Sequence, residues 1–212
     1  MAKIEKWEAL EYLDEIINTF DGVMVARGDL GVEIPQEQVP SVQKRIIALA
    51  NKAGKPVVIA TQLLETMVES PTPTRAEISD IANAIFDGTD ALLVTGETAI
   101  GKFPEEVIEV LSKVVLETEQ TIDFDNIYQP ITHQQHTADA ISHATCQIAN
   151  DMDIGVILTL THSGSTARMI ARYKPSADII ALTPVEKTYR QLYIICLLYK
   201  SDADDERSSV DL

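Results

Sequence analysis

The sequence predicts an α/β protein in which short parallel strands alternate with amphipathic helices. Between residues 2 and 121, a short apolar run, a polar cluster and a segment of helical periodicity recur four times. The apolar runs are continuous instead of alternating with polar residues, which is typical of parallel strands covered on both faces. Turn signals such as Asp21-Gly22 and Asp87-Gly88 separate the units, as the short connections of an α/β fold require.

Four pairs of a strand and a helix are expected in this first part. The strands are expected at residues 2–5, 22–26, 56–61 and 91–95, and the helices at residues 7–18, 36–53, 75–86 and 104–121. Four such units form half of an eightfold (β/α)8 barrel, although an open doubly wound sheet gives the same pattern. Each strand-like run ends in polar side chains, and barrel enzymes assemble their sites from such strand ends. The pattern therefore favours a partial TIM barrel.

A second, smaller domain is expected after a linker. The composition changes to Asn, Gln and His at residues 124–137, so we interpret this segment as a linker that follows a first domain at residues 1–123. A second α/β pattern occupies residues 138–195, with a helix to about residue 150, strands at 155–160 and 178–182, a helix between them and another after Pro184. Two strands this close in sequence need a right-handed crossover to be parallel. We therefore expect an incomplete α/β domain.

Composition excludes several classes of function. With 212 residues and 45% hydrophobic content, the chain can bury a core. The net charge of -16 argues against a nucleic-acid partner, although local cations, a metal or helix N-termini can still attract phosphorylated metabolites. The apolar stretches are far shorter than the roughly 20 residues of a membrane helix, and the N-terminus lacks an apolar secretion signal, so we expect a cytoplasmic protein without membrane contact. Cys146 and Cys196 are expected to be reduced thiols.

Lys3, Glu5 and Asp29 are candidates for a site that combines a cation with a divalent metal. Lys3 and Glu5 are two residues apart on one expected strand, so their side chains point to the same face, the lumen side of a barrel. Glu5 and Asp29 offer the carboxylate oxygens that Mg²⁺ accepts together with waters and substrate oxygens. The ammonium of Lys3 can stabilise negative charge on a transferring phosphoryl group or an enolate. The alternative is a surface salt bridge between Lys3 and Glu5.

Two further strand ends carry groups that can hold an anion. Residues 26–31 have the sequence ARGDLG and are expected to form a glycine-bearing turn, in which the amides of Gly28 and Asp29 could hold an anionic oxygen. Thr61 and Gln62 follow the third strand and could supply a hydroxyl and an amide to a substrate carboxylate. The alternative for Thr61 and Gln62 is a helix cap.

Five motifs resemble the pyruvate kinase family and occur in that family's order. They are KIE at residues 3–5, DGVMVARGDLGVEIP at 21–35, ATQLLETM at 60–67, PTRAE at 73–77 and TGETA at 95–99. The second motif is highly distinctive, and the resemblance spans about residues 3–192. It implies that residues 1–123 hold strands 5–8 of the family's barrel with their helices, and that the C-terminal domain of the family begins after them.

The resemblance implies phosphoryl transfer from phosphoenolpyruvate to ADP, which gives pyruvate and ATP in glycolysis. Lys3 would stabilise the phosphoryl group in transfer and the enolate, and Glu5 and Asp29 would bind Mg²⁺. The amides of Gly28 and Asp29, with Thr61, would hold the substrate carboxylate, and Thr61 is also the candidate for the proton-transfer path. Such chemistry depends mainly on positioning and charge stabilisation. Supporting roles are implied for Arg27, Gln62 and Glu97.

The same resemblance implies that the isolated chain is catalytically inactive. It begins at the family's fifth barrel strand, so the first four strands, the lid domain and the ligands of K⁺ and the nucleotide have no counterpart. Ile100 stands where many relatives have a lysine near the nucleotide phosphates, which puts a direct nucleotide contact there in doubt. The whole protein is expected to need Mg²⁺ and K⁺ and to form a homotetramer.

The second domain carries a hydroxyl-rich turn between a strand and a helix, a geometry that can hold phosphates. It resembles the effector loop that binds phosphorylated sugars in regulated pyruvate kinases, and the alternative is an ordinary helix cap. Its candidate contacts are Thr161, Ser163, Gly164, Ser165 and Thr166. Residues 196–212 resemble translated adapter sequence, and we interpret them as a non-native tail.

Two other functions stay open from the sequence. One is a different Mg²⁺-dependent barrel enzyme that acts on phosphoenolpyruvate or an enolate. The other is a non-catalytic sugar-phosphate-binding module, which only the hydroxyl-rich turn supports.

Overall fold

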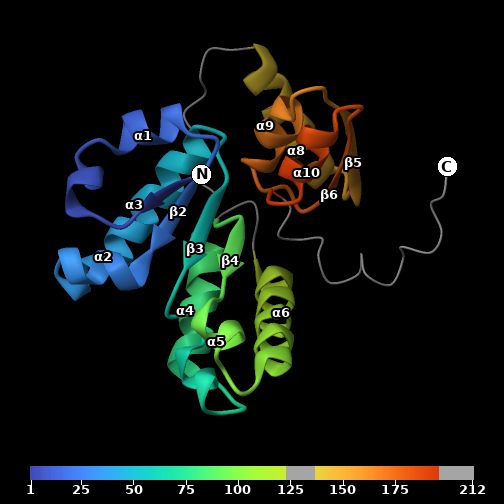
Figure 1. The fold of residues 1–212 in the computed structure, drawn as a ribbon. Helices are drawn as coiled ribbons and strands as arrows, with labels where there is room; N and C mark the ends of the chain where they lie inside the picture. The colour runs from blue at the N-terminus through green and yellow to red at the C-terminus, as the bar shows by residue number, and fades with distance from the viewer. Residues whose placement is uncertain (123–136, 196–212) are drawn as a thin grey trace. The chain divides into compact units, whose positions relative to one another are not determined.

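The computed structural model describes residues 1–122 and 137–195. The chain divides into two compact units, Met1–Asp123 and Phe124–Leu212, and each is described by itself (Figure 1). The segment interpreted as a linker, residues 124–137, lies outside the described residues except for Thr137, which begins a helix, and the segment interpreted as a tail, residues 196–212, lies outside them entirely. Within the described part of the chain, no helix is long and apolar enough to cross a membrane.

Unit 1 is built on a parallel sheet, as the sequence predicts. Its strands pair in the order β1-β2-β3-β4, and Val23 of the second strand lies opposite both Ala2 and Val57. A doubly wound sheet reverses its strand order at a switch point, whereas this order follows the sequence throughout. The arrangement is therefore that of consecutive barrel strands. The bounds are β1 (Ala2–Ile4), β2 (Val23–Ala26), β3 (Val57–Ala60) and β4 (Ala91–Leu93).

The helices of unit 1 lie between and after these strands (Figure 1). Helix α4 begins at the predicted residue because Thr74 and Glu77 cap it reciprocally. The Thr74 amide donates to the Glu77 carboxylate at 2.7 Å, and the Glu77 amide donates to the Thr74 hydroxyl at 3.3 Å. The elements are η1 (Trp7–Leu10), α1 (Leu13–Thr19), α2 (Arg27–Glu33), η2 (Gln36–Gln38), α3 (Val39–Lys52), η3 (Glu65–Val68), α4 (Arg75–Phe86), α5 (Gly96–Ala99) and α6 (Pro104–Thr121).

Two local expectations for unit 1 are wrong. The single helix expected at residues 7–18 is divided into the 3-10 helix η1 and the short helix α1. The expected turn at residues 26–31 is instead the start of helix α2. Glycine disfavours a helix interior by roughly 1 kcal/mol, which is why the two glycines indicated a turn. Tertiary hydrogen bonds at the beginning of α2, described below, favour the helix.

The core of unit 1 lies between the sheet and its helices. Val25 and Ile59 of the strands and Ile46 and Ile47 of α3 are all fully buried. Burial of each such side chain contributes about 1.5–3 kcal/mol, so the contact of α3 with the sheet is a main source of stability. Among the described strands, β1 and β4 each have one neighbour only, so they are the edges of this sheet.

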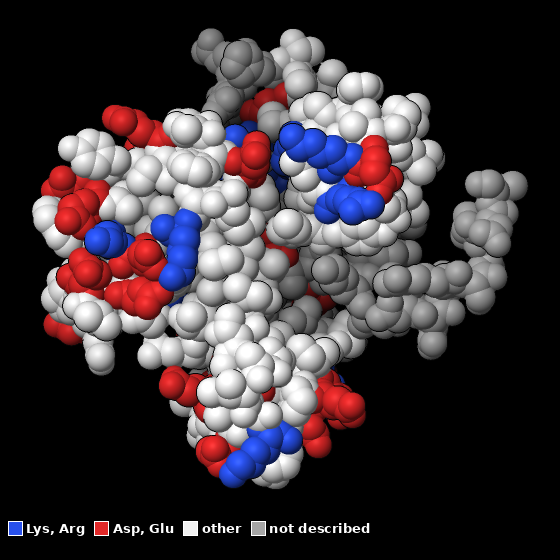
Figure 2. Space-filling view, in the orientation of Figure 1, with Lys and Arg blue, Asp and Glu red and all other residues white. Residues whose placement is uncertain are grey.

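Acidic side chains outnumber basic ones, 33 to 17. On the face shown in Figure 2, basic side chains lie directly beside acidic ones. The ion pairs of the described residues include two between residues one helical turn apart, Lys113 with Glu109 at 2.6 Å and Arg190 with Glu186 at 2.8 Å. Exposed pairs of this kind contribute about 0–1 kcal/mol, so they do not determine the fold.

Unit 2 contains a two-stranded parallel sheet with helices on one face, as predicted for a partial α/β domain. Cys146, Ile157 and Ile170 are among the residues of its buried core. On the other face of the sheet, Leu158 and Leu160 are 64% and 76% exposed. The bounds are α8 (Thr137–Asp151), β5 (Val156–Leu160), α9 (Ser165–Ala171), β6 (Asp178–Leu182) and α10 (Glu186–Leu192).

Candidate active site

Lys3, Glu5 and Asp29 meet at the carboxyl ends of two adjacent strands. Lys3 lies in β1 and Glu5 follows it, while Asp29 lies in the first turn of α2, directly after β2. The Lys3 ammonium donates to Asp29 Oδ2 at 2.7 Å and also to Glu5 Oε2. Because β1 and β2 are parallel neighbours, their carboxyl ends lie at the same edge of the sheet, and this brings the three charges together. The expected convergence is therefore present.

The charges of this cluster stabilise one another. Hydrogen bonds to Asp29 and Glu5 raise the pKa of Lys3, and the hydrogen bond from Lys3 lowers the pKa of Asp29. Lys3 therefore stays an ammonium and Asp29 a carboxylate at neutral pH. Their side chains are 50% and 55% exposed, so substrate can reach them.

The cluster fits a divalent cation in part. Lys3 bonds one oxygen of each carboxylate, Oδ2 of Asp29 and Oε2 of Glu5, so the second oxygen of each can face a cation. Among the described residues, no group of three or more Asp, Glu, His or Cys side chains could hold a metal. Mg²⁺ commonly takes only one or two protein carboxylates and completes its shell with water and substrate oxygens. Glu5 and Asp29 are compatible with that limited contribution.

Thr61 and Gly28 contact each other beside the charged cluster. The Gly28 amide donates to Thr61 Oγ1 at 2.8 Å, and this hydroxyl donates to the Ala60 carbonyl at 2.6 Å. The Gly28 amide, expected to face an anionic oxygen, is thus bonded to the chain itself. The first amides of a helix have no acceptor within the helix, which explains why the Gly28 amide donates to Thr61 instead. A substrate carboxylate at this amide would have to replace the Thr61 hydroxyl.

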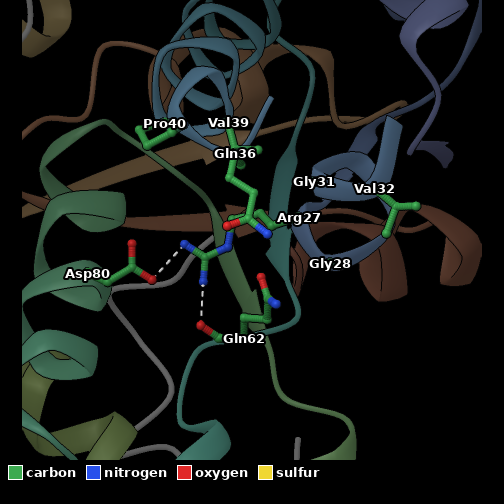
Figure 3. Close-up of a pocket in the computed structure, with 9 residues that line it drawn as sticks. All are labelled: Arg27, Gly28, Gly31, Val32, Gln36, Val39, Pro40, Gln62 and Asp80. Atoms are coloured by element: carbon green, nitrogen blue, oxygen red, sulfur yellow. Dashed lines mark hydrogen bonds and ion pairs between the residues drawn. The ribbon is translucent and has the colours of Figure 1, made fainter. Parts of the chain in front are cut away.

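Arg27, for which a supporting role is expected, is buried. Its side chain is 7% exposed, and Nη1 lies 2.6 Å from Asp80 Oδ2. Its guanidinium also donates to the carbonyls of Thr61 and Gln62, and Figure 3 shows the contacts with Gln62 and Asp80. Arg27 therefore contacts the protein itself at this position.

Gln62 lies at a pocket of about 400 Å³ that Arg27 and Asp80 also line (Figure 3). Its side chain is exposed, and its main-chain carbonyl accepts from Arg27 at 2.9 Å. The side-chain amide thus stays accessible, and its contact with a substrate carboxylate stays a prediction.

Glu97 is buried and hydrogen-bonded to two neighbouring segments of the main chain. It lies in α5, just after β4, and only 3% of its surface is exposed. Its carboxylate accepts the Leu64 amide at 3.2 Å and the Thr95 amide at 2.9 Å. Glu97 therefore ties together the segments that follow β3 and β4, which agrees with a supporting position and leaves its part in catalysis a prediction.

The hydroxyl-rich turn of unit 2 is held by its own side chains. Thr161 Oγ1 accepts the Gly164 amide at 2.9 Å, and Gly164 has a φ of 79°, a conformation that favours glycine. Ser163 Oγ donates to Ser165 Oγ at 3.1 Å, and both residues are exposed together with Thr166. The Arg168 guanidinium donates to the Ser163 carbonyl at 3.0 Å. The turn thus presents hydroxyls to solvent beside one cation.

Comparison with known proteins decides the family. The family model described as pyruvate kinase, barrel domain, matches residues 1–108, and the one described as pyruvate kinase, alpha/beta domain, matches residues 139–209. The chain belongs to the pyruvate kinase family. This confirms the resemblance drawn from the five motifs, and with it the partial barrel followed by an α/β domain.

Individual pyruvate kinases are similar over almost the whole chain. The enzyme of Thermotoga maritima is 54% identical over 195 residues, which are 92% of this chain and 41% of that protein. The enzyme of Clostridium acetobutylicum is 48% identical over 90% of this chain and 41% of its own. A crystal structure of a pyruvate kinase from Cryptosporidium parvum superposes with a TM-score of 0.87, at 44% identity, over 91% of this chain and 40% of that one. The chain thus spans about two fifths of these pyruvate kinases.

Sequence reasoning missed Asp80, which pairs with Arg27 in this pyruvate kinase chain. Asp80 lies in the middle of α4, 53 residues from Arg27, where a single acidic residue on a helix surface is ordinary. The ARGDLG motif offered a signal, because a buried arginine needs a carboxylate, but the motif does not say which one.

Proposed function

We propose that the protein to which this chain belongs transfers the phosphoryl group of phosphoenolpyruvate to ADP and forms pyruvate and ATP. The observation that carries the proposal is the meeting of Lys3 with Glu5 and Asp29 at the carboxyl ends of β1 and β2. An ammonium beside two carboxylates suits a reaction in which a cation is held and negative charge develops next to it. Membership of the pyruvate kinase family supports the choice of substrates.

Lys3 and the two carboxylates have separate tasks in this proposal. Lys3, whose pKa is raised by Asp29 and Glu5, donates hydrogen bonds to the phosphoryl oxygens and to the enolate oxygen. Glu5 and Asp29 hold Mg²⁺, which when bound neutralises charge on the phosphoryl oxygens. K⁺ and the nucleotide are assigned to the part of the family's proteins that this chain does not span.

Thr61 and the start of α2 bind the substrate carboxylate in this proposal. The Gly28 amide and Thr61 Oγ1 are hydrogen-bonded at 2.8 Å. When this hydrogen bond breaks, both groups are close enough to contact the same substrate carboxylate. The amide of Asp29 follows in the same first helical turn. Thr61 Oγ1 also holds the proton that is relayed toward the enolate. Gln62 and Glu97 support this segment, the first from the pocket side and the second through the Leu64 amide.

The turn at Thr161 to Thr166 is assigned to a phosphorylated sugar effector. Ser163, Gly164 and Ser165 offer hydroxyls and amides, and Arg168 brings a positive charge to the same turn. Calorimetric titration of the chain with a hexose bisphosphate tests this assignment. Binding that Ser165→Ala and Thr166→Ala weaken supports it, and no heat of binding leaves the turn as a helix cap. By kinship, the whole enzyme is a cytoplasmic homotetramer.

The test of the main proposal uses a completed enzyme. We define this as residues 1–195 joined to the parts of the Thermotoga maritima relative that precede and follow them in the alignment. Pyruvate formation should be absent for the isolated chain and present for the completed enzyme. Lys3→Met should lower kcat at least 10²-fold, as loss of a charge-stabilising donor does, while the exposed neighbour Lys6→Met should not. Turnover by the isolated chain, or an active Lys3→Met enzyme, contradicts the proposal.

A further inference from the structure

We infer that Arg27, fixed by Asp80, is a positioning residue that holds the backbone of Thr61 and Gln62 and thereby places the Thr61 hydroxyl. The inference deepens the proposed function, on which its catalytic consequence rests. Its structural part stands on the contacts of Arg27 alone.

Thr61 and Gln62 have an unusual backbone that needs a cause. Their φ angles are 69° and 55°, both in the left-handed region that favours glycine. A β-branched residue such as threonine is a clear outlier there, because its Cβ approaches the backbone closely. Such conformations persist only where surrounding contacts determine them. They follow β3 directly, at the end of the strand where a barrel places its site.

Arg27 supplies those contacts. Its Nε and Nη2 donate to the Thr61 carbonyl at 3.2 and 3.0 Å, and Nη2 also donates to the Gln62 carbonyl at 2.9 Å. Two successive carbonyls thus accept from one planar group, and Figure 3 shows the contact with Gln62. A lysine presents a single point of charge and cannot reproduce this fork of donors.

The guanidinium is itself held from two helices. Asp80 of α4 lies 2.6 Å from Nη1, and Gln43 of α3 accepts from the same nitrogen at 3.4 Å. The Arg27 side chain is 7% exposed, and a buried cation needs such compensation. Asp80 therefore fixes the direction in which Arg27 points its remaining donors.

The first turn of α2, which contains Arg27, also binds the side chain of Thr61. Gly28 follows Arg27 in α2, and its amide donates to Thr61 Oγ1 at 2.8 Å. Residues 27 and 28 thus bind both the carbonyl and the hydroxyl of one threonine. Without the guanidinium, the carbonyl is released and the peptide can rotate toward an ordinary conformation. The Thr61 hydroxyl then leaves its place beside Gly28.

Kinetics of the completed enzyme test this inference. Arg27→Lys keeps the positive charge but lacks the planar set of donors, and Asp80→Asn removes the charge that fixes Arg27. Each should therefore lower kcat/KM for phosphoenolpyruvate about tenfold or more, because the Thr61 hydroxyl serves both carboxylate binding and proton transfer. Arg45→Lys, an exposed arginine of α3, is the matched control and should change neither constant. In a Thr61→Val background, Arg27→Lys should have less than a twofold further effect, because the hydroxyl that it positions is gone. If the fold-losses of kcat/KM caused by Thr61→Val and by Arg27→Lys multiply in the double variant, the inference is overturned.

A second readout is independent of activity. In threonine-labelled completed enzyme, a strong intraresidue NOE between the amide and Hα protons marks a positive φ at Thr61. This NOE should be present in the wild type and in Arg45→Lys, and it should be lost or weakened in Arg27→Lys and Asp80→Asn. If it persists at full strength in the folded Arg27→Lys and Asp80→Asn enzymes, the inference is overturned. If one variant does not fold by circular dichroism, the other decides. A wild type that keeps the NOE without transferring phosphate refutes the proposed function alone.

Discussion

Asp139 Oδ1 and Arg172 Nη2 lie 2.5 Å apart in unit 2, with their side chains 0% and 2% exposed. The Tyr173 hydroxyl donates to the same carboxylate oxygen at 2.6 Å. Burial, and next the hydrogen bond to Asp139, raise the pKa of Tyr173, so this hydroxyl keeps its proton. The pair joins the beginning of α8 to the residue that follows α9.

Removal of one charge from this pair should destabilise the protein strongly. Asp139→Asn removes the carboxylate that pairs with the buried Arg172 cation, and breaking a buried pair in this way lowers the free energy of unfolding by about 3–5 kcal/mol. Chemical denaturation followed by circular dichroism measures the change. Asp151→Asn, at the exposed other end of α8, should change it by about 0.5 kcal/mol or less. An equal loss in the two variants would contradict the prediction.

The cap of α4 should make stability depend on pH. Burial opposes ionisation of Glu77, but the amides of Thr66 and Thr74 outweigh it and lower its pKa. Because the pKa of Glu77 is lower in the folded protein than in the unfolded chain, its ionised carboxylate stabilises the folded protein at pH values above the unfolded pKa near 4.5. This contribution is lost as the pH falls through the folded-state pKa. Glu77→Gln should therefore be less stable than wild type at pH 7, and the gap should narrow toward pH 3.

Denaturation curves at several pH values measure that gap. Loss of the Thr74 hydroxyl in Thr74→Ala should lower stability by about 1 kcal/mol, and Thr74→Ser should restore it. A gap between wild type and Glu77→Gln that stays constant from pH 7 to 3 would refute the assigned pKa direction.

Any side chain at position 28 should displace the hydroxyl of Thr61. A Cβ at this position would lie 3.3 Å from Thr61 Oγ1, so the hydroxyl must shift by a few tenths of an ångström. Displacement of a substrate-positioning group lowers activity, and we expect Gly28→Ala to reduce kcat/KM of the completed enzyme about tenfold. At Gly96, a Cβ meets nothing within 4 Å, so Gly96→Ala is the control and should stay active. Full activity of Gly28→Ala would count against a role for Thr61.

Cys146 should be chemically inert in the folded protein. Burial raises the pKa of its thiol from 9.0 to about 12, so the thiolate fraction at neutral pH falls by about a thousandfold. Alkylation by iodoacetamide, measured by mass spectrometry in a Cys196→Ser background, should be fast in urea and very slow without it. Equal rates in the two conditions would show that the thiol is accessible.

The sequence predicted the structure correctly where the conformation depends on residues close together in the chain or on a general rule of sheet topology. Helices α4 and α6 have the predicted bounds because caps and prolines mark their beginnings. The meeting of Lys3 and Asp29 followed from the rule that parallel strands end at one edge. The helix α2 and the pair of Arg27 with Asp80 could not be derived, because both depend on contacts between residues far apart in sequence. Local propensity even indicated the opposite structure at Gly28.

The order of the strands in unit 1 also bears on how the chain acquires its structure. Ala2 pairs with Val23, Val23 with Val57 and Val58 with Ala91, so every pairing closes a loop of a few dozen residues at most. The entropy lost in closing a loop grows only slowly with length, and contacts of short range speed folding. Each strand can therefore dock on its predecessor as synthesis proceeds, so that the sheet grows from β1 toward β4.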